Sequence, residues 1–207
     1  MIGTASIVEE AKQLELAGVD AIVAQGSEAG GHRATFLRRT ADVLIGTMAL
    51  VPQIVDQVAV PVIASGGIMD GRGLVASLTL GASAVQMGTA FLACMESGAY
   101  TVYKKAILSA NEDSTVVTRA YSGRAARGIQ TKFIREMDQY PGVIPAFPIQ
   151  NAMKRDIRQA AAKTNNPEYM SLWAGQGLRL ATDHSAGTLI KQTMSQSHAL
   201  LEKMIKG

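Results

Sequence analysis

The sequence is poor in cysteine, in aromatic residues and in stretches of like charge. A single cysteine, Cys94, stands among 207 residues, so the chain forms no internal disulfide, which fits a reducing compartment. Aromatic residues make up 5% of the chain, and no run of lysine and arginine alternates with them. The net charge of +3 therefore gives no sign of a nucleic-acid-binding surface. We find neither a signal peptide nor an apolar run long enough to span a bilayer, so we expect a cytoplasmic protein without a membrane partner.

Three short apolar segments, each followed by glycine, alternate with helical patterns in the first 90 residues. Hydrophobic residues make up 47% of the chain, which is enough for a core. Strands that alternate with helices predict a parallel sheet with right-handed crossovers, and almost purely apolar strands are typical of sheets buried on both faces. The predicted elements are strand 20–25, a helix near 48–58, strand 61–65, helix 71–80 and strand 84–87.

A helical pattern precedes the first of these strands. Apolar residues recur at helical spacing from Ile7 to Ala17, and Gly18 ends the pattern. Ser6 and Glu9 form a capping-box pattern at its start. At most a stub of strand fits before this helix, and three strands with a stub are too few to close a barrel of eight.

The pattern changes after the third strand. The predicted elements there are helices at 98–110, 151–163 and 186–206 and a β-rich stretch at 114–121. Pro141, Pro145 and Pro148 interrupt the segment between the β-rich stretch and the second helix. We expect residues 98–180 to form a small helical cap or insert that packs on the sheet.

Glycine-rich loops follow the second and third strands. They are Ser65-Gly66-Gly67 and Gln86-Met87-Gly88-Thr89. Glycine lets backbone N–H groups approach an anion closely, and Thr89 adds a hydroxyl donor. In α/β barrels, the loops after the last two strands often bind phosphate. Tight turns alone would also explain these glycines, but the two loops together favour a phosphate site.

A histidine stands in the loop after the first strand. Gln25-Gly26 ends the strand, and Gly30-Gly31-His32 follows. Loops after barrel strands carry catalytic residues, and histidine accepts protons near neutral pH. The alternative is a surface loop with an incidental histidine. Glu28 and His32 have no third ligand nearby, so we expect no metal site.

Three further features each allow two interpretations. Cys94 lies in an apolar stretch, which favours a buried structural cysteine over a nucleophile. Arg124 and Arg127 fit either a phosphate contact or a solvated turn. The run Gly175-Gln176-Gly177 fits either the rim of a pocket or an ordinary turn.

The glycine–histidine loop and the two phosphate-type loops together resemble the nitronate monooxygenase family, formerly called 2-nitropropane dioxygenases. The matching segments are 24–33, 61–68, 81–90, 122–128 and 173–177, so the resemblance covers nearly the whole chain. It implies an α/β fold of the (β/α)8 TIM-barrel type. The family's N-terminal strands have no counterpart here. We therefore expect residues 1–207 to be the C-terminal portion of an FMN-binding barrel domain, with 98–180 as its insert.

The same resemblance implies a flavoenzyme that oxidises alkyl nitronates or nitroalkanes with O₂ to a carbonyl compound and nitrite. His32 would be the active-site base or a residue that orients the substrate. Gln25 and Gly26 would lie near the isoalloxazine ring of FMN. The other residues expected to bind the cofactor are Ser65, Gly66, Gly67, Gln86, Gly88 and Thr89.

Two other functions stay open. A related FMN enzyme, an enoyl-acyl-carrier-protein reductase, also has a Gly-Gly-His loop, but it needs NAD(P)H, for which the sequence shows no separate fingerprint. The third possibility is an inactive remnant that binds phosphate weakly or serves in assembly. The open apolar sheet edge of a partial barrel would favour a homo-oligomer.

Overall fold

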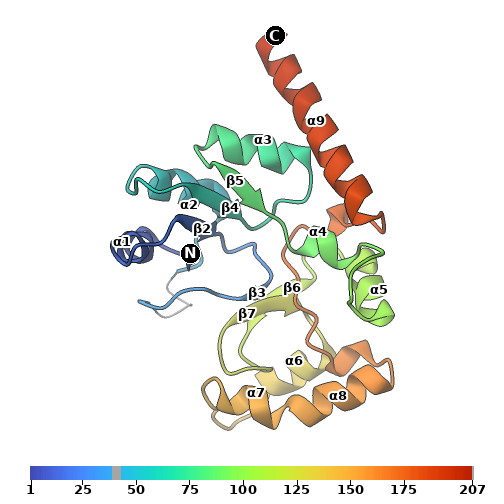
Figure 1. The fold of residues 1–207 in the computed structure, drawn as a ribbon. Coiled ribbons are helices and arrows are strands. Elements are labelled where there is room, and N and C mark those ends of the chain that lie inside the picture. Colours follow the sequence, from blue (N-terminus) through green and yellow to red (C-terminus); the bar gives the residue numbers. More distant parts are fainter. Residues whose placement is uncertain (39–42, 207) are drawn as a thin grey trace.

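A four-stranded parallel sheet forms the centre of the N-terminal half of the chain. The computed structural model describes residues 1–38 and 43–206. The strands, in the spatial order β1-β2-β4-β5, are β1 (Ile2–Ala5), β2 (Ala21–Gln25), β4 (Val62–Ser65) and β5 (Ala84–Gln86). The three predicted strands are thus confirmed, and the predicted stub is a full strand, β1, that pairs in parallel with β2. β2, β4 and β5 run in parallel and end at one edge of the sheet, where their glycine loops begin (Figure 1).

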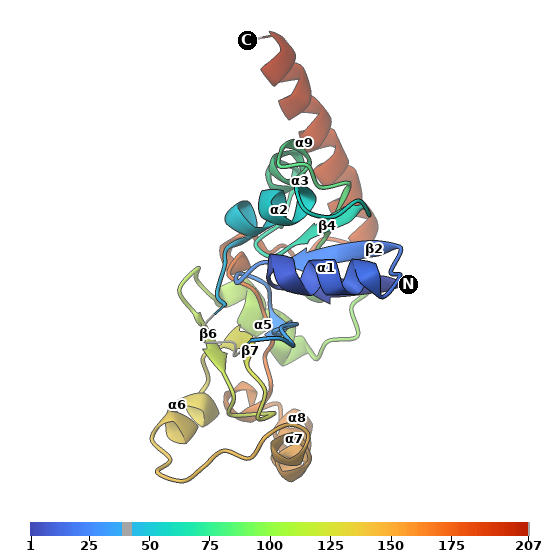
Figure 2. The same cartoon turned by 90° about the vertical axis from the view of Figure 1, so that its left-hand side faces the viewer.

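Three helices cover one face of this sheet. They are α1 (Val8–Leu16), α2 (Thr47–Val55) and α3 (Gly71–Thr79), and they lie together on that side (Figure 2). The core between sheet and helices is fully buried and includes Ile22, Leu50 and Ile54. Burial of each such side chain contributes about 1.5–3 kcal/mol, so this face holds the sheet and its loops in place.

The start of α1 differs from the predicted capping box. Ser6 donates hydrogen bonds from its N–H and Oγ to the carboxylate of Glu10, both at 2.8 Å, and Glu9 is exposed. The fully buried Glu10 carboxylate also binds the loop that follows β2. The donors from that loop are Thr35 Oγ1 (2.7 Å), Phe36 N–H (2.7 Å) and Leu37 N–H (3.1 Å). The prediction that Glu9 is the partner of Ser6 was therefore wrong, because this loop recruits the next carboxylate.

A second, antiparallel sheet joins the histidine loop to the later part of the chain. Its strands, in the order β3-β7-β6, are β3 (Gly31–His32), β7 (Ala126–Ile129) and β6 (Thr115–Thr118). His32 pairs with Ala126, so the loop after β2 lies beside a segment far along the chain. The sequence predicted β6 but neither β3 nor β7.

Residues 98–180 combine helices with two of these strands. A short helix, α4 (Thr89–Leu92), precedes this segment. The helices within it are α5 (Thr101–Ser109), α6 (Lys132–Asp138), α7 (Ile149–Met153), α8 (Arg155–Lys163) and the 3-10 turns η2 (Pro167–Tyr169) and η3 (Leu178–Leu180). The helix predicted at 151–163 is therefore two helices that meet at Lys154.

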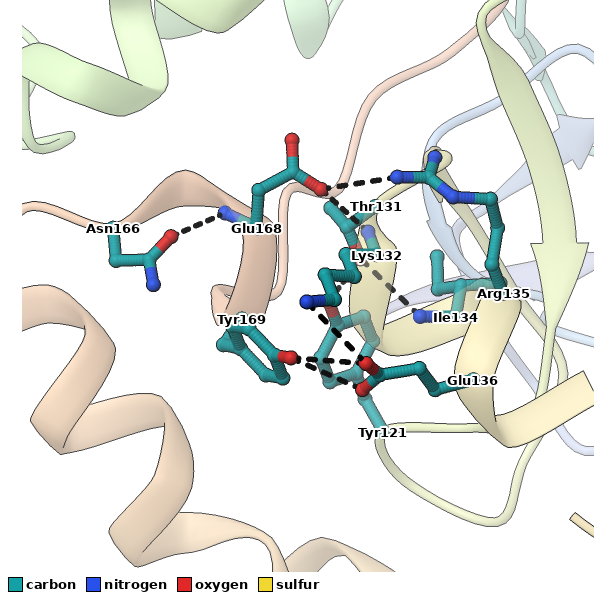
Figure 3. Close-up of polar contacts among 9 residues, drawn as sticks. All are labelled: Tyr121, Thr131, Lys132, Ile134, Arg135, Glu136, Asn166, Glu168 and Tyr169. Atoms are coloured by element: carbon teal, nitrogen blue, oxygen red, sulfur yellow. Dashed lines mark hydrogen bonds and ion pairs between the residues drawn. The ribbon is translucent and has the colours of Figure 1, made fainter.

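A polar network fastens α6 to η2. The Glu168 carboxylate accepts a hydrogen bond from Arg135 at 3.3 Å, and the Tyr169 hydroxyl donates to Glu136 at 3.1 Å (Figure 3). Exposed ion pairs of this kind contribute about 0–1 kcal/mol each, so their effect here is mainly to fix geometry. Because η2 leads into the segment that carries Trp173, the network helps to set the path of the chain toward the sheet.

The chain ends in a long helix, α9 (Ala186–Lys206), as predicted. Its first half packs on α3, and its second half projects away from the rest of the molecule (Figure 1). The contact is close: a Cβ added at Gly71 would lie 2.6 Å from the Thr193 carbonyl oxygen. No helix in the described part of the chain is long and apolar enough to cross a membrane.

Candidate active site

A cavity of about 250 Å³ lies where β2, β4 and β5 end. Seven residues predicted to bind the cofactor line it, and they are Gln25, Ser65, Gly66, Gly67, Gln86, Gly88 and Thr89. The structure therefore brings the loops after all three strands to one place. Gly26 and His32, the other two predicted site residues, are not among the lining residues.

The glycine loops offer unused backbone donors to this cavity. Gly66 and Gly67 have φ angles of 122° and 71°, which favour glycine because other residues rarely adopt them. The N–H groups of Gly66, Gly67 and Gly88 have no hydrogen-bond acceptor among the residues that the structure describes. A Cβ added at Gly88 would meet no atom within 4 Å, so open space lies beside it. Donors of this kind fit an anionic group such as phosphate.

The segment around Trp173 closes the opposite side of the cavity. Trp173, Gly175 and Gly177 all line it, so the glycines of this run form a pocket rim. Gly175 N–H donates to Thr89 Oγ1 at 2.9 Å, which leaves the hydroxyl proton of Thr89 available. A Cβ added at Gly30 would lie 2.5 Å from the carbonyl carbon of Ala174, so the histidine loop and this rim touch. The sequence had not marked Trp173 itself as a lining residue.

His32 does not line the cavity, but its ring lies beside that of Trp173, which does. The centroids of the two rings are 5.6 Å apart. His32 Nε2 is 2.8 Å from Ser122 Oγ, and Ser122 donates its own proton to the Arg124 carbonyl oxygen at 3.0 Å. When Ser122 donates to that carbonyl, Nε2 of a neutral His32 donates to Ser122 and Nδ1 is the acceptor.

The electrostatic surroundings keep His32 neutral. Partial burial of the ring lowers the pKa of His32 below its ordinary value, and the positive charges of Arg124 and Arg158 lower the pKa further. Because the ordinary value is about 6.5, the imidazole is uncharged at neutral pH and is able to accept a proton.

The arginines near the site donate hydrogen bonds to backbone carbonyl oxygens and do not line the cavity. Arg33, which is 1% exposed, donates to the carbonyl oxygens of Gly26 at 2.5 Å and of Gln25 at 3.1 Å. Arg127 donates to the Ser27 carbonyl oxygen at 2.8 Å. Arg124 donates to a carbonyl of the same loop, that of Thr35, at 3.2 Å. Neither Arg124 nor Arg127 lines the cavity. Arg124 is exposed in the turn before β7, as the solvated-turn alternative expects, and Arg127 is buried.

Gly26 has a structural reason to be glycine. A Cβ there would lie 1.9 Å from Thr47 Oγ1, so the position must be glycine for α2 to approach β2. Gly26 is not among the described lining residues of the cavity, and its place near the isoalloxazine ring stays a prediction.

Cys94 and the other two histidines do not line the cavity. Cys94 is 2% exposed, which confirms a buried structural cysteine, and burial raises the pKa of its thiol. His184 and His198 are exposed. In the described part of the chain, no group of three or more His, Cys, Asp and Glu side chains is arranged to hold a metal ion.

Residues 1–196 match the model of a protein family described as nitronate monooxygenase. The chain belongs to the nitronate monooxygenase family. It is 53% identical over 203 residues to a "Probable nitronate monooxygenase" of Staphylococcus aureus strain MSSA476, a match that covers 98% of this chain and 57% of that relative. The chain thus spans a little over half the length of the curated relatives it matches.

Two solved structures show the same architecture. A nitroalkane oxidase from Streptomyces ansochromogenes is 40% identical and superposes with a TM-score of 0.92 over 98% of this chain and 58% of that one. FabK from Thermotoga maritima is 34% identical, with a TM-score of 0.82 over 99% of this chain and 63% of that one. The α/β fold of TIM-barrel type, represented by part of a barrel, is thereby confirmed for this member of the nitronate monooxygenase family.

Proposed function

We propose that this chain takes part in the FMN-dependent oxidation of alkyl nitronates and nitroalkanes with O₂ to a carbonyl compound and nitrite. The observation that carries the proposal is that unused glycine N–H donors from two strand ends lie in a cavity lined by Trp173, whose ring is 5.6 Å from that of the neutral His32. Membership of the nitronate monooxygenase family and the likeness to a nitroalkane oxidase support the same reaction class.

The cavity suits the phosphate end of FMN. Typical small-molecule sites measure about 300–1,000 Å³, so a cavity of about 250 Å³ would enclose one end of a cofactor of this size. Gly66, Gly67 and Gly88 would donate N–H groups to the phosphate, with the hydroxyls of Ser65 and Thr89 beside them. The amides of Gln25 and Gln86 would face the flavin ring. When bound, FMN would accept electrons from the substrate and pass them to O₂.

His32 would act on nitroalkanes through Nδ1. The hydrogen bond from Nε2 to Ser122 orients the ring, and the lowered pKa keeps Nδ1 able to take the proton from the carbon next to the nitro group. A nitronate has already lost this proton and does not need the base. Substitution of His32 by Asn should therefore reduce turnover of nitroalkanes more than turnover of nitronates.

The likeness to FabK favours a second candidate. This is the FMN- and NAD(P)H-dependent activity of an enoyl-acyl-carrier-protein reductase type. Consumption of NADH that depends on an enoyl thioester, without O₂ uptake on nitronate, would select this candidate over the first.

The first experiment is the absorption spectrum of the purified chain after incubation with FMN and gel filtration. We expect flavin bands to elute with the protein, and O₂ uptake to follow the addition of a nitronate. A colourless protein that cannot retain FMN would contradict the proposal and leave the third possibility, a remnant that serves in binding or assembly. The elution volume would also test our proposal that the chain self-associates.

The same proposal extends to organisation and location. Residues 98–180 would act as a cap or insert on the barrel part, because their strand β7 pairs with the histidine loop. We also propose a cytoplasmic location, which the single reduced cysteine supports.

A further inference from the structure

A carboxylate stands in the wall of the cavity that is proposed to hold phosphate. Glu28 is the one charged side chain among the described lining residues. A free carboxylate would repel a phosphate, so its presence at this place requires a structural reason. The reason lies in what the two carboxylate oxygens bind.

The Glu28 carboxylate is bound to the start of α2. The N–H of Thr47, the first residue of that helix, is 2.9 Å from both Oε1 and Oε2. The N-terminal N–H groups of a helix have no acceptor within the helix and carry partial positive charge, so they favour a carboxylate. The negative charge of Glu28 is thus directed to the helix and not to the cavity.

The Thr47 hydroxyl lies between the Glu28 carboxylate and the glycine loop after β4. Thr47 Oγ1 is 2.9 Å from Glu28 Oε2 and also 2.9 Å from the carbonyl oxygen of Gly66. A hydroxyl has one proton, and both neighbours are acceptors. The two acceptors therefore share this proton, and the hydroxyl holds the Gly66 carbonyl and the carboxylate at hydrogen-bond distance on either side of it.

The bond to the Gly66 carbonyl sets the direction of the next N–H. In a trans peptide the C=O of one residue and the N–H of the following residue point in opposite directions. A Gly66 carbonyl that points at Thr47 therefore turns the Gly67 N–H away from Thr47. This N–H has no acceptor among the described residues, and Gly67 lines the cavity.

Two glycines make room for this hydroxyl. Added Cβ atoms at Gly26 and Gly66 would lie 1.9 Å and 2.7 Å from Thr47 Oγ1. Thr47 is 7% exposed, so its hydroxyl fills a closed slot between the ends of β2 and β4. Thr47 therefore packs against the ends of both strands.

We propose that Glu28 and Thr47 are positioning residues that orient the Gly66–Gly67 peptide toward the phosphate of the cofactor. The inference rests on the proposed FMN-dependent function. Both side chains act through the Gly66 carbonyl and donate no hydrogen bond to the phosphate.

The test compares FMN with riboflavin, which has the same ring and lacks the phosphate. Dissociation constants would be measured for both ligands from the quenching of Trp173, the one tryptophan of the chain, which lines the cavity. The ratio of the riboflavin constant to the FMN constant reports the contribution of the phosphate. Thr47→Val should lower this ratio about tenfold, the effect of about one hydrogen bond, and leave riboflavin binding unchanged. Glu28→Ala should act in the same direction.

Controls separate positioning from folding. Thr47→Ser keeps the hydroxyl and should retain the wild-type ratio. Thr79→Val removes an exposed hydroxyl that bonds within α3, and it should change neither constant. Melting temperatures without flavin would show that each variant folds.

The outcomes distinguish this inference from the proposed function. A wild-type chain that binds neither flavin contradicts the proposed function, and the inference fails with it. If the wild-type chain prefers FMN and Thr47→Val keeps the same ratio, only the inference is overturned. Equal loss of FMN and riboflavin binding in Thr47→Val would also overturn it, because that result assigns Thr47 a general structural role.

Discussion

Ser122 Oγ lies 2.8 Å from His32 Nε2, although the two residues are 90 positions apart in the chain. The pairing of β3 with β7 brings them together, because His32 pairs with Ala126 just beyond the serine turn. When Ser122 donates its proton to the Arg124 carbonyl, it accepts the one on Nε2 and so selects the tautomer of the histidine. In that state, the atom that accepts a proton in the proposed reaction is set by a residue of the turn between β6 and β7.

The positive charge of Arg124 should have a measurable effect on the pKa of His32. Arg124→Ala removes one positive charge that disfavours the imidazolium, so the pKa of His32 should rise toward its ordinary value. NMR titration of the three histidines would measure this shift, with His32→Asn used to assign the signal. Lys203→Ala, which removes an exposed charge near the end of α9, should leave the pKa of His32 unchanged.

The same shift should appear in the pH dependence of nitroalkane turnover. The base must be neutral, so turnover should fall as the pH drops through the pKa of His32. In Arg124→Ala this fall should begin at a higher pH than in the wild type. An identical midpoint in both proteins would contradict the role of His32 as the base.

Glu10, and not Glu9, should stabilise the start of α1. Burial alone would raise the pKa of Glu10, but hydrogen bonds from Thr35, Ser6 and the loop backbone outweigh it, and the pKa is lowered. Glu10→Gln replaces an acceptor by a donor in a buried network, which should cost about 1–3 kcal/mol in the free energy of unfolding at pH 7. The exposed Glu9→Gln should stay within about 0.5 kcal/mol of the wild type.

Urea unfolding at several pH values would test the sign of this effect. A carboxyl group with a lowered pKa in the folded state adds stability above its unfolded pKa and loses it as the pH falls through the folded pKa. The difference between the wild type and Glu10→Gln should therefore shrink in acid below about pH 4. A constant difference across this range would show that ionised Glu10 contributes no stability.

The sequence was sufficient to predict the parallel sheet and its glycine loops. Strands such as Ala21–Gln25 are continuous apolar runs that end in glycine, so both their type and their ends are encoded locally. Loops after neighbouring parallel strands must meet at one edge, which explains why seven of the predicted site residues share one cavity.

The rest of the site depends on contacts between distant segments. β3 has two residues, too few for any periodicity, and it exists because β7 pairs with it. Ser6 pairs with Glu10 and not with Glu9 because the Glu10 carboxylate also binds the loop at Thr35. The sequence pattern of the helix carries no information about this loop. Trp173 reaches the cavity because its segment packs on Gly30, a contact that only the folded chain creates.

Gly88 offers the most direct test of the cavity, with Gly98 as its matched control. A Cβ added at either glycine meets no atom within 4 Å, and neither has a left-handed backbone, so alanine fits both positions. Both Gly→Ala variants should melt at or slightly above the wild-type temperature. Alanine makes the unfolded chain less flexible, which stabilises the folded state by about 0.4–1 kcal/mol.

Only Gly88 lines the cavity, so only Gly88→Ala places a methyl group where the phosphate is expected. FMN should bind Gly88→Ala at least about tenfold more weakly than the wild type, a loss of about 1.4 kcal/mol, and should bind Gly98→Ala as it binds the wild type. If both variants keep wild-type affinity, the phosphate lies elsewhere, and the open space beside Gly88 has no part in binding.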